Sequence, residues 1–198
     1  MEWLTALIVG YLLGSIPFGM ILTRIAGAGD LRSIGSGNIG ATNVLRTGRK
    51  GLAAATLLLD LGKGLVAVLV AWRWFPDAVA LAGAAAMIGH CFPFWLRFRG
   101  GKGVATLMGV SLGFAWPIGL TYALTWIGML AVTRISSLAG MTAAVAAPIA
   151  AHITGNGQFV PVLAALAAIV IGLHRANIVR LLAGTEPRVG GGAKDGTS

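Results

Sequence analysis

The chain has 198 residues, of which 57% are hydrophobic and only 11% are charged, and its net charge is +9. A soluble core of this size cannot bury so much apolar surface, whereas several apolar runs reach the roughly 20 residues that cross a hydrocarbon layer about 30 Å thick. The basic residues lie in short loops between these runs, which is typical of membrane topology signals and anionic ligands and argues against nucleic acid as a partner. The single cysteine, Cys91, excludes an internal disulfide and a cysteine-based metal cluster. We therefore predict an all-α, polytopic integral membrane protein.

Three predicted spans follow directly from uninterrupted apolar runs. They cover residues 3–24, 52–72 and 77–97. The run that begins at Trp3 has neither a basic leader nor a small-residue cleavage site before the next polar loop, so we expect a retained span and not a signal peptide. We expect the whole chain, residues 1–198, to form a single domain, with residues 190–198 as a flexible tail.

Two longer apolar runs are each predicted to form a pair of helices. A single helix over residues 104–133 would be about 45 Å long, too long to stand upright in the bilayer. Pro117 offers a turn, so we expect helices over 104–117 and 119–133. The run 138–173 is predicted to form a second helical hairpin, which brings the number of transmembrane helices to seven. Its interruptions are His152, residues 155–157 and Pro161.

Basic residues set the predicted orientation of these spans. By the positive-inside rule, their distribution puts the amino terminus outside and the carboxyl terminus in the cytoplasm. A five-span alternative, in which each hairpin is one long helix, also leaves the carboxyl terminus inside. It moves Arg134, Ser136 and Ser137 outside, and we therefore favour seven spans. The basic residues on the predicted cytoplasmic side are Arg24, Arg32, Arg46, Arg49, Lys50, Arg97, Arg99, Lys102, Arg134, Arg175, Arg180, Arg188 and Lys194.

The first predicted cytoplasmic loop is rich in small and amide-bearing residues between positions 33 and 43. Glycines let the backbone turn its N–H groups inward, and serine, threonine and asparagine add further donors, which is how proteins cradle phosphate. Arg46 can grip phosphate oxygens with its planar guanidinium group. The alternative is a flexible loop in which Thr42 or Asn43 caps the next helix. The candidate ligand-binding residues are Ser33, Ser36, Gly37, Asn38, Thr42, Asn43 and Arg46.

A second polar loop precedes the helix predicted to begin at Val104. Its Gly-Gly-Lys-Gly sequence would offer an anion free N–H groups, the positive end of a helix dipole and a lysine charge. We therefore name Gly101, Lys102 and Gly103 as candidate binding residues. The alternative is an interface anchor, in which Arg99 and Lys102 pair with lipid headgroups.

A third polar segment follows the last predicted span. If the helix continues, His174, Asn177 and Arg180 are spaced by three residues and share one face, which could hold a polyol hydroxyl and a phosphate. The alternative is a basic segment at the membrane edge. Ser137 lies on the same side of the membrane and could reach the same ligand, although a helix cap is the favoured role for Ser136 and Ser137.

Ionisable residues within the spans are few. Asp60 and Lys63 lie one helical turn apart in the second span, where charges are costly, so we expect them to pair with each other, with Lys63 as an alternative ligand. His90 is expected to be a packed interfacial residue. The three histidines lie in separate segments without acidic companions, and so we predict no metal site.

Three ordered motifs identify a family. They are Ser-x-Gly-Ser-Gly-Asn-x-Gly-Ala-Thr-Asn from Ser33, Gly-His-x-Phe-Pro before Phe-x-Gly-Gly-Lys-Gly-Val-Ala-Thr, and His-Arg-x-Asn-Ile-x-Arg-Leu-x2-Gly-x-Glu from His174. Together with Leu-Asp-x2-Lys-Gly from Leu59, they resemble the bacterial acyl-phosphate:glycerol-3-phosphate acyltransferases, the PlsY family. The resemblance runs from about residue 10 to residue 188. At Arg188 a lysine is common in the family, which conserves the charge.

The resemblance implies a seven-span enzyme of the bacterial inner membrane whose active site faces the cytoplasm. Such an enzyme moves a fatty acyl group from a long-chain acyl phosphate to the 1-hydroxyl of glycerol 3-phosphate, and releases lysophosphatidate and inorganic phosphate. It would need no cofactor, and neither coenzyme A nor acyl carrier protein would be the donor. Membrane lipids would be its other contacts.

The resemblance also suggests which residues hold each substrate. We expect Ser36, Lys102, His174 and Asn177 to be catalytic, with the other named residues binding substrate. One competing function is a transporter of organophosphate or another anion, and a second is a structural scaffold. The polar motifs crowd one side of the membrane and no internal repeat is visible, which favours the enzyme. The headgroup of the acyl phosphate is assigned to Ser36, Asn38, Thr42, Gly101 and Lys102, and glycerol 3-phosphate to Arg46, Ser137, His174 and Asn177, with Lys102 able to bridge both.

Overall fold

The computed structural model describes residues 1–190, and its regular structure is entirely helical. The predicted flexible tail therefore lies, apart from Gly190, outside the described residues. Four short 3-10 turns connect the longer helices: Leu31–Ser33, Pro76–Ala78, Phe94–Leu96 and Gly157–Phe159. The α-helices are α1 (Glu2–Gly14), α2 (Phe18–Ile25), α3 (Ala41–Leu45), α4 (Lys50–Trp74), α5 (Val79–Cys91), α6 (Val104–Phe114), α7 (Trp116–Thr133), α8 (Ser136–Ile153), α9 (Val160–Leu173) and α10 (Arg175–Leu182).

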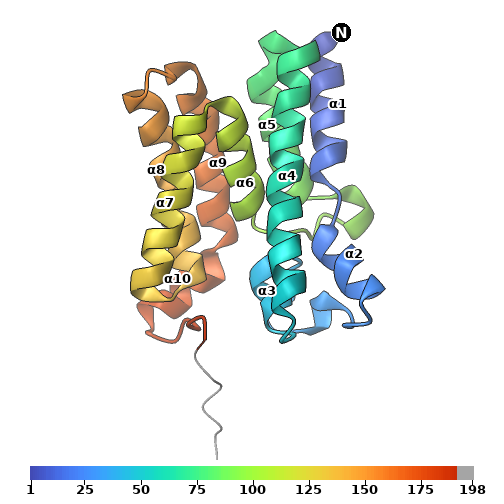
Figure 1. Cartoon of the computed structure of the whole chain (residues 1–198), viewed down its shortest axis with the longest axis vertical. Helices are drawn as coiled ribbons and strands as arrows, with labels where there is room; N and C mark the ends of the chain where they lie inside the picture. Colours follow the sequence, from blue (N-terminus) through green and yellow to red (C-terminus); the bar gives the residue numbers. More distant parts are fainter. Residues whose placement is uncertain (191–198) are drawn as a thin grey trace, which may run out of the picture.

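The long helices form two groups that stand side by side (Figure 1). In one group α1, α4 and α5 pack against one another, and in the other α8 packs against both α7 and α9. Helix α6 packs against both α4 and α7 and so joins the groups. The short helices α2, α3 and α10 all lie at the end of the molecule opposite the amino terminus (Figure 1). This end carries all three polar segments.

The helices confirm a multi-pass membrane protein, but their lengths do not give seven spans. Within residues 1–190, five helical segments are long and apolar enough to cross a bilayer, and α9 with α10 would make a sixth if this pair, bent by 62°, is one span. Helix α6 has only 11 residues. At 1.5 Å per residue it covers about 16 Å, roughly half of the hydrocarbon layer. The five segments are Glu2–Ile25, Lys50–Trp74, Pro76–Leu96, Trp116–Thr133 and Ser136–Ile153.

Pro117 and Pro161, which were expected to mark turns, lie at the starts of helices. The chain turns at Ala115, whose backbone is extended, and Pro117 lies in the first turn of α7. The expected helices 104–117 and 119–133 therefore have a boundary at residue 115. Pro161 likewise lies in the first turn of α9, where the missing N–H would have no helical partner. By contrast, the expected single helix over 3–24 is broken, since α1 ends at Gly14 and α2 begins at Phe18, directly after Pro17.

Glycines let the helices pack with their backbones almost in contact. A Cβ atom on Gly10 or Gly14 of α1 would lie 2.4 or 1.9 Å from a backbone oxygen of α5. A Cβ atom on Gly109 of α6 would lie 1.9 Å from the Leu61 oxygen of α4. Small residues are the usual contact residues between membrane helices, because lipid gives no hydrophobic drive for larger ones to associate. The α4–α6 contact that joins the two groups therefore depends on a missing side chain.

We expect Gly109→Ala to destabilise the fold by about 1–3 kcal/mol, because the added methyl group overlaps backbone that can only move as a whole helix. The measurement is thermal unfolding of the purified protein in detergent. Gly62→Ala in α4 is the matched control, because nothing lies within 4 Å of its added Cβ atom. That variant should be neutral or slightly stabilised by the higher helix propensity of alanine. Equal melting temperatures for the two variants would contradict this account of the packing.

Candidate active site

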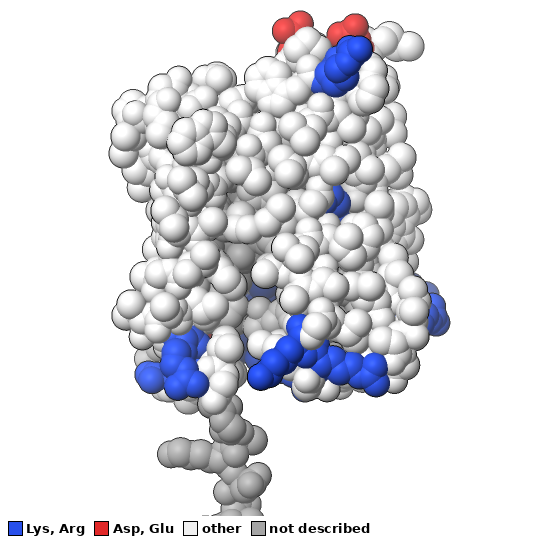
Figure 2. Space-filling model, viewed as in Figure 1, with Lys and Arg blue, Asp and Glu red and all other residues white. Residues whose placement is uncertain are grey.

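A cavity of about 400 Å³ opens between the two helix groups, at the end that carries the polar segments. Figure 2 shows a hollow between the groups there, with most of the visible lysine and arginine atoms around the end below it. The cavity brings the three polar segments of the sequence together. Ser36, Lys102 and His174, which are far apart along the chain, all line it.

All but three of the predicted site residues lie on the wall of this cavity. The three that do not are Ser33, Gly37 and Gly101. Of these, Ser33 is turned into its own loop, since its hydroxyl donates a hydrogen bond to the Asp30 carbonyl oxygen over 2.8 Å. The predicted residues that line the cavity are Ser36, Asn38, Thr42, Asn43, Arg46, Lys102, Gly103, Ser137, His174 and Asn177.

The side chain of Asn43 organises the first loop. Its buried amide nitrogen donates to the carbonyl oxygens of Leu31, Ile34 and Asn38 over 2.9, 3.0 and 2.8 Å. Its amide oxygen accepts the backbone N–H of Ser36 over 3.2 Å. Asn43 lies within α3, whose N-cap is Gly40, so neither Asn43 nor Thr42 is the helix cap that was the alternative. The loop therefore has a fixed course around one side chain.

Several backbone N–H groups of this loop are bonded within the loop itself. The N–H of Gly37 bonds to the Ile34 oxygen over 2.9 Å, and that of Gly40 to the Asn38 side chain over 2.9 Å. These two amides therefore do not contribute to the expected cradle of inward-facing N–H groups. Gly35, with φ of +53°, is needed for close approach, since its Cβ would lie 2.7 Å from the Asn43 amide oxygen. Buried amides need partners inside the protein, and the loop supplies them locally.

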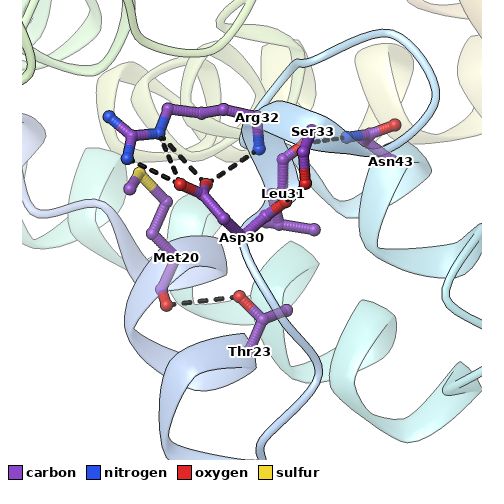
Figure 3. Close-up of polar contacts among 7 residues, drawn as sticks. All are labelled: Met20, Thr23, Asp30, Leu31, Arg32, Ser33 and Asn43. Carbon is purple, nitrogen blue, oxygen red and sulfur yellow. Dashed lines mark hydrogen bonds and ion pairs between the residues drawn. The ribbon is translucent and has the colours of Figure 1, made fainter.

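An exposed ion pair fixes the start of the loop (Figure 3). The Asp30 carboxylate accepts the backbone N–H of Arg32 over 3.0 Å and pairs with its guanidinium group over 2.6 Å. The side-chain hydrogen bond from Arg32 lowers the pKa of Asp30 to about 2. Figure 3 also shows the Asn43 amide beside this turn, bonded to Leu31. The turn holds the loop in place from outside the cavity.

The second loop approaches the cavity over a histidine. The N–H groups of Gly100 and Gly101 bond to the carbonyl oxygens of Cys91 and His90, each over 3.0 Å. A Cβ atom on Gly101 would lie 2.0 Å from the Nε2 atom of His90, so only glycine allows this contact. Gly103 adopts φ of +83° and is the N-cap of α6, which aims the positive end of the helix dipole towards the cavity. Lys102 extends from this loop and donates a hydrogen bond to the Asn177 side chain.

The third segment bends at His174. Helix α9 ends at Leu173 and α10 begins at Arg175, at an angle of 62°. The expected continuous helix is therefore kinked, although the spacing still brings His174 and Asn177 to the same cavity. The Nδ1 atom of buried His174 lies 2.7 Å from the Val170 carbonyl oxygen. A carbonyl can only accept, so Nδ1 carries the hydrogen and Nε2 of the neutral ring is left as an acceptor.

Glu186 is a cavity residue that the sequence analysis did not name. Its carboxylate accepts hydrogen bonds from Ser137, Asn177 and Arg180 over 2.6, 2.5 and 2.7 Å. The signal was its place at the end of the third motif. The carboxylate stands beside the donors that were expected to hold glycerol 3-phosphate. It also fixes the orientation of the Asn177 amide, whose oxygen then faces Lys102.

The segment after Glu186 is held against the start of α8. The backbone N–H of Val189 donates to the Arg134 oxygen over 2.7 Å, and Nε of Arg134 returns a bond to Val189 over 3.1 Å. At the same end, the Ser136 hydroxyl lies 3.0 Å from that of Thr42. Ser136 and Ser137 make no cap hydrogen bond to α8, whose N-cap is Ile135. Both serines contact other segments instead, which corrects the expected capping role.

Two opposite effects set the charges in the cavity. Burial lowers the pKa of the Lys102 ammonium group, and the nearby positive charges of Arg180 and Arg46 lower it further. Burial by itself raises the pKa of the Glu186 carboxyl group, but its three hydrogen bonds and the positive charge of Arg180 outweigh this effect, so the pKa lies below its ordinary value of 4.5. Lys102 therefore lacks a full counter-charge, and a bound anion would supply one. Within residues 1–190, no group of three or more His, Cys, Asp or Glu side chains is placed to hold a metal ion.

Fold and cavity together define a multi-pass helical membrane protein with a polar, cation-lined cavity at one end. The chain belongs to the glycerol-3-phosphate acyltransferase family, whose model matches residues 4–184. Among its relatives, the glycerol-3-phosphate acyltransferase of Novosphingobium aromaticivorans is 70% identical over 189 residues, which are 96% of each chain. That of Erythrobacter litoralis is 64% identical over 93% of this chain and 94% of the relative.

Solved structures give the same result. The crystal structure of PlsY, an integral membrane glycerol 3-phosphate acyltransferase, in its glycerol 3-phosphate form is 37% identical, with a TM-score of 0.90 over 95% of this chain and 96% of that one. Its lysophosphatidic acid form has a TM-score of 0.88 at 36% identity, over 95% of each chain. The resemblance to the PlsY family is confirmed, and the protein is an acyltransferase.

We expect Asn43→Asp to lower the stability of the protein by about 2–4 kcal/mol and to abolish most activity, because an oxygen would replace the donor that faces three carbonyl oxygens. Thermal unfolding and turnover are the two measurements. Asn156→Asp is the matched control, because the exposed amide of Asn156 contacts only Thr154. If the Asn43 variant unfolded and turned over like the control, Asn43 could not be the organiser of the loop.

We also expect a pH-dependent contribution from Glu186. Because its pKa is lowered in the folded protein, the stabilisation is fully present above pH 4.5 and is lost as the pH falls through the lowered value. The melting temperature of Glu186→Gln should be below that of the wild type at pH 7, and the difference should shrink below pH 4.5. Glu2→Gln, at the exposed amino terminus, should show no such difference. A difference that did not change with pH would contradict the prediction.

Proposed function

We propose that this protein transfers a fatty acyl group from an acyl phosphate to the sn-1 hydroxyl of glycerol 3-phosphate, yielding lysophosphatidate and inorganic phosphate. The carrying observation is that a single cavity gathers Arg46, Lys102 and Arg180 from three separate segments. Two phosphates must be held close together in this reaction, and three cations around one cavity suit that need. The family and the glycerol 3-phosphate and lysophosphatidic acid forms of PlsY support the same substrates.

We assign the acyl-phosphate headgroup to the first and second loops, and glycerol 3-phosphate to the side chains around His174. The contact between Lys102 and Asn177 joins the two groups, which suits Lys102 as the residue that reaches both phosphates. Gly101 lies outside the cavity wall, so its role is to let the loop rest on His90. Gly37 and Ser33 belong to the frame of the first loop. The headgroup residues are Ser36, Asn38, Thr42 and Lys102, and the acceptor residues are Arg46, Ser137, His174 and Asn177.

The reaction needs no covalent enzyme intermediate, because an acyl phosphate is already activated. The 1-hydroxyl oxygen attacks the carbonyl carbon, the bond from that carbon to the phosphate oxygen breaks, and the hydroxyl proton ends on the released phosphate. The free Nε2 of His174 is placed to accept the proton on the way, and the substrate's own phosphate is an equally suitable acceptor. Alignment of the hydroxyl and neutralisation of the leaving phosphate by Lys102 supply the rate enhancement.

The fatty chain of the donor has an apolar route. Leu57 of α4, Val104 and Ala105 of α6 and Trp126 of α7 line the same cavity as the polar residues. We infer that the donor slides in sideways from the lipid between these helices. The soluble acceptor arrives from the basic end.

We further propose a single domain with seven spans, an outer amino terminus, and a cavity that faces the cytoplasm of a bacterial inner membrane. The cavity end carries most of the lysine and arginine atoms visible in Figure 2, which supports this orientation by the positive-inside rule. Helix α6 is short, but the loop before it rests on His90 and Cys91. Irregular backbone within a membrane is tolerated where protein covers it, so α6 with this loop can serve as the seventh span.

We expect Lys102→Ala to reduce lysophosphatidate formation by about a hundredfold or more, since it removes a charge aimed at the leaving phosphate. The assay incubates the purified variant with palmitoyl phosphate and radiolabelled glycerol 3-phosphate. The melting temperature of the variant should stay close to that of the wild type. Lys50→Ala, an exposed residue at the start of α4, is the matched control. Wild-type turnover by the Lys102 variant would refute its role. Uptake of glycerol 3-phosphate into liposomes without a new lipid product would instead indicate a transporter.

A further inference from the structure

Three buried ionisable residues lie at or next to the cavity wall, and the proposed reaction does not use them. Asp60 and Lys63 belong to α4 and His90 to α5. All three are buried, with 3%, 5% and 4% of their surfaces exposed. Asp60 and His90 also form part of the cavity wall. Charges at membrane depth are expensive to bury, so a functional role is the default hypothesis for such a group.

The three side chains form one network, in which Asp60 and Lys63 pair and the His90 ring lies against Asp60 with no hydrogen bond from Nδ1 to any described residue. The Nζ atom of Lys63 lies 2.8 Å from Oδ1 of Asp60, and Nδ1 of His90 lies 3.7 Å from the same oxygen. Lys63 also donates a hydrogen bond over 2.8 Å to the carbonyl oxygen of Ile16, at the break between α1 and α2. The expected pairing of Asp60 with Lys63 is thus present. The network joins this break, α4 and α5.

His90 carries the network to the second loop. Its carbonyl oxygen accepts the N–H of Gly101, and the next carbonyl, of Cys91, accepts that of Gly100. Its ring lies directly under Gly101, where even a Cβ atom would lie 2.0 Å from Nε2. Lys102 is the next residue in the chain. The ring is therefore the surface on which the lysine-bearing loop rests.

We propose that the buried Asp60–Lys63–His90 network is a positioning device, which holds the loop of residues 100–103 so that Lys102 points into the cavity. A buried ion pair is poor support for stability, because well-packed apolar residues of similar volume often stabilise as much or more. Its presence in α4 is explained if the Asp60 carboxylate, 3.7 Å from Nδ1, keeps the His90 ring in place. The proposal rests on the proposed function only in taking Lys102 as the group that meets the donor phosphate.

The test replaces the charged pair as a unit, with Asp60→Leu and Lys63→Met in the same chain. No uncompensated charge remains, so we expect a melting temperature in detergent at or above that of the wild type. We expect kcat/KM for palmitoyl phosphate to fall about 10- to 100-fold, since a shift of roughly 1 Å in a catalytic group can cost that much. Backbone hydrogen–deuterium exchange over residues 98–104 should become faster, with no change in α8 and α9.

Two further variants complete the experiment. His90→Leu removes the ring and leaves both backbone acceptors, so it should loosen the same loop and lower kcat/KM in the same way. It also tests the proposal if the double variant does not fold. Ser111→Ala is the matched control, because this buried hydroxyl in α6 has no hydrogen-bond partner within residues 1–190. It should leave both readouts unchanged.

The proposal is overturned if the variants fold with wild-type exchange over residues 98–104, or with wild-type kcat/KM for the donor. It is also overturned if they lose activity in proportion to a general loss of stability, with faster exchange in every helix. Loop exchange is measured without substrate, so it stands apart from the reaction. If Lys102→Ala turned over normally, the proposed function of that lysine would fail, while loop exchange would still decide whether the network positions the loop.

Discussion

The hydrogen bond between Lys102 and Asn177 is the contact that makes one site out of two helix groups. Lys102 comes from the loop that leads into α6, and Asn177 from α10 at the far end of the chain. An amide can donate from one end and accept at the other. Glu186 takes the donor end of Asn177, and the oxygen is thereby turned to Lys102. One carboxylate thus orders a cationic cavity while leaving most of its positive charge for an anionic ligand.

In the glycine-rich loops, several backbone N–H groups bond to acceptors within the protein. Backbone N–H groups that are buried away from water need a partner within the protein. Asn43 supplies such partners in the first loop, and His90 and Cys91 supply them in the second. The glycines serve close approach, as Gly35 does beside Asn43 and Gly101 does over His90.

Glycine also allows close contact within the helix bundle. Gly109 lets α6 touch the backbone of α4, and this contact sets the two groups of helices against each other. With the bundle closed at this point, the cavity remains at the end where the short helices lie. Polar groups and a lipid-accessible wall can then share one space. A water-soluble substrate and a lipid-soluble one can meet there without either crossing the bilayer.

The sequence alone determined the class of protein, the apolar segments and the three polar motifs, because hydrophobic run length and motif spacing are local properties of the chain. Ten of the thirteen residues that it named for the site, from Ser36 to Asn177, lie on the cavity wall, since the basic loops all fall on one predicted side. Only the tertiary structure decided which groups of each motif face the cavity. Contacts between distant segments decide which side chains point inward, where the chain bends at His174 and how Asn43 bonds the first loop. They also place Glu186 beside Asn177. Such contacts are fixed by packing between helices, and no short stretch of sequence contains them.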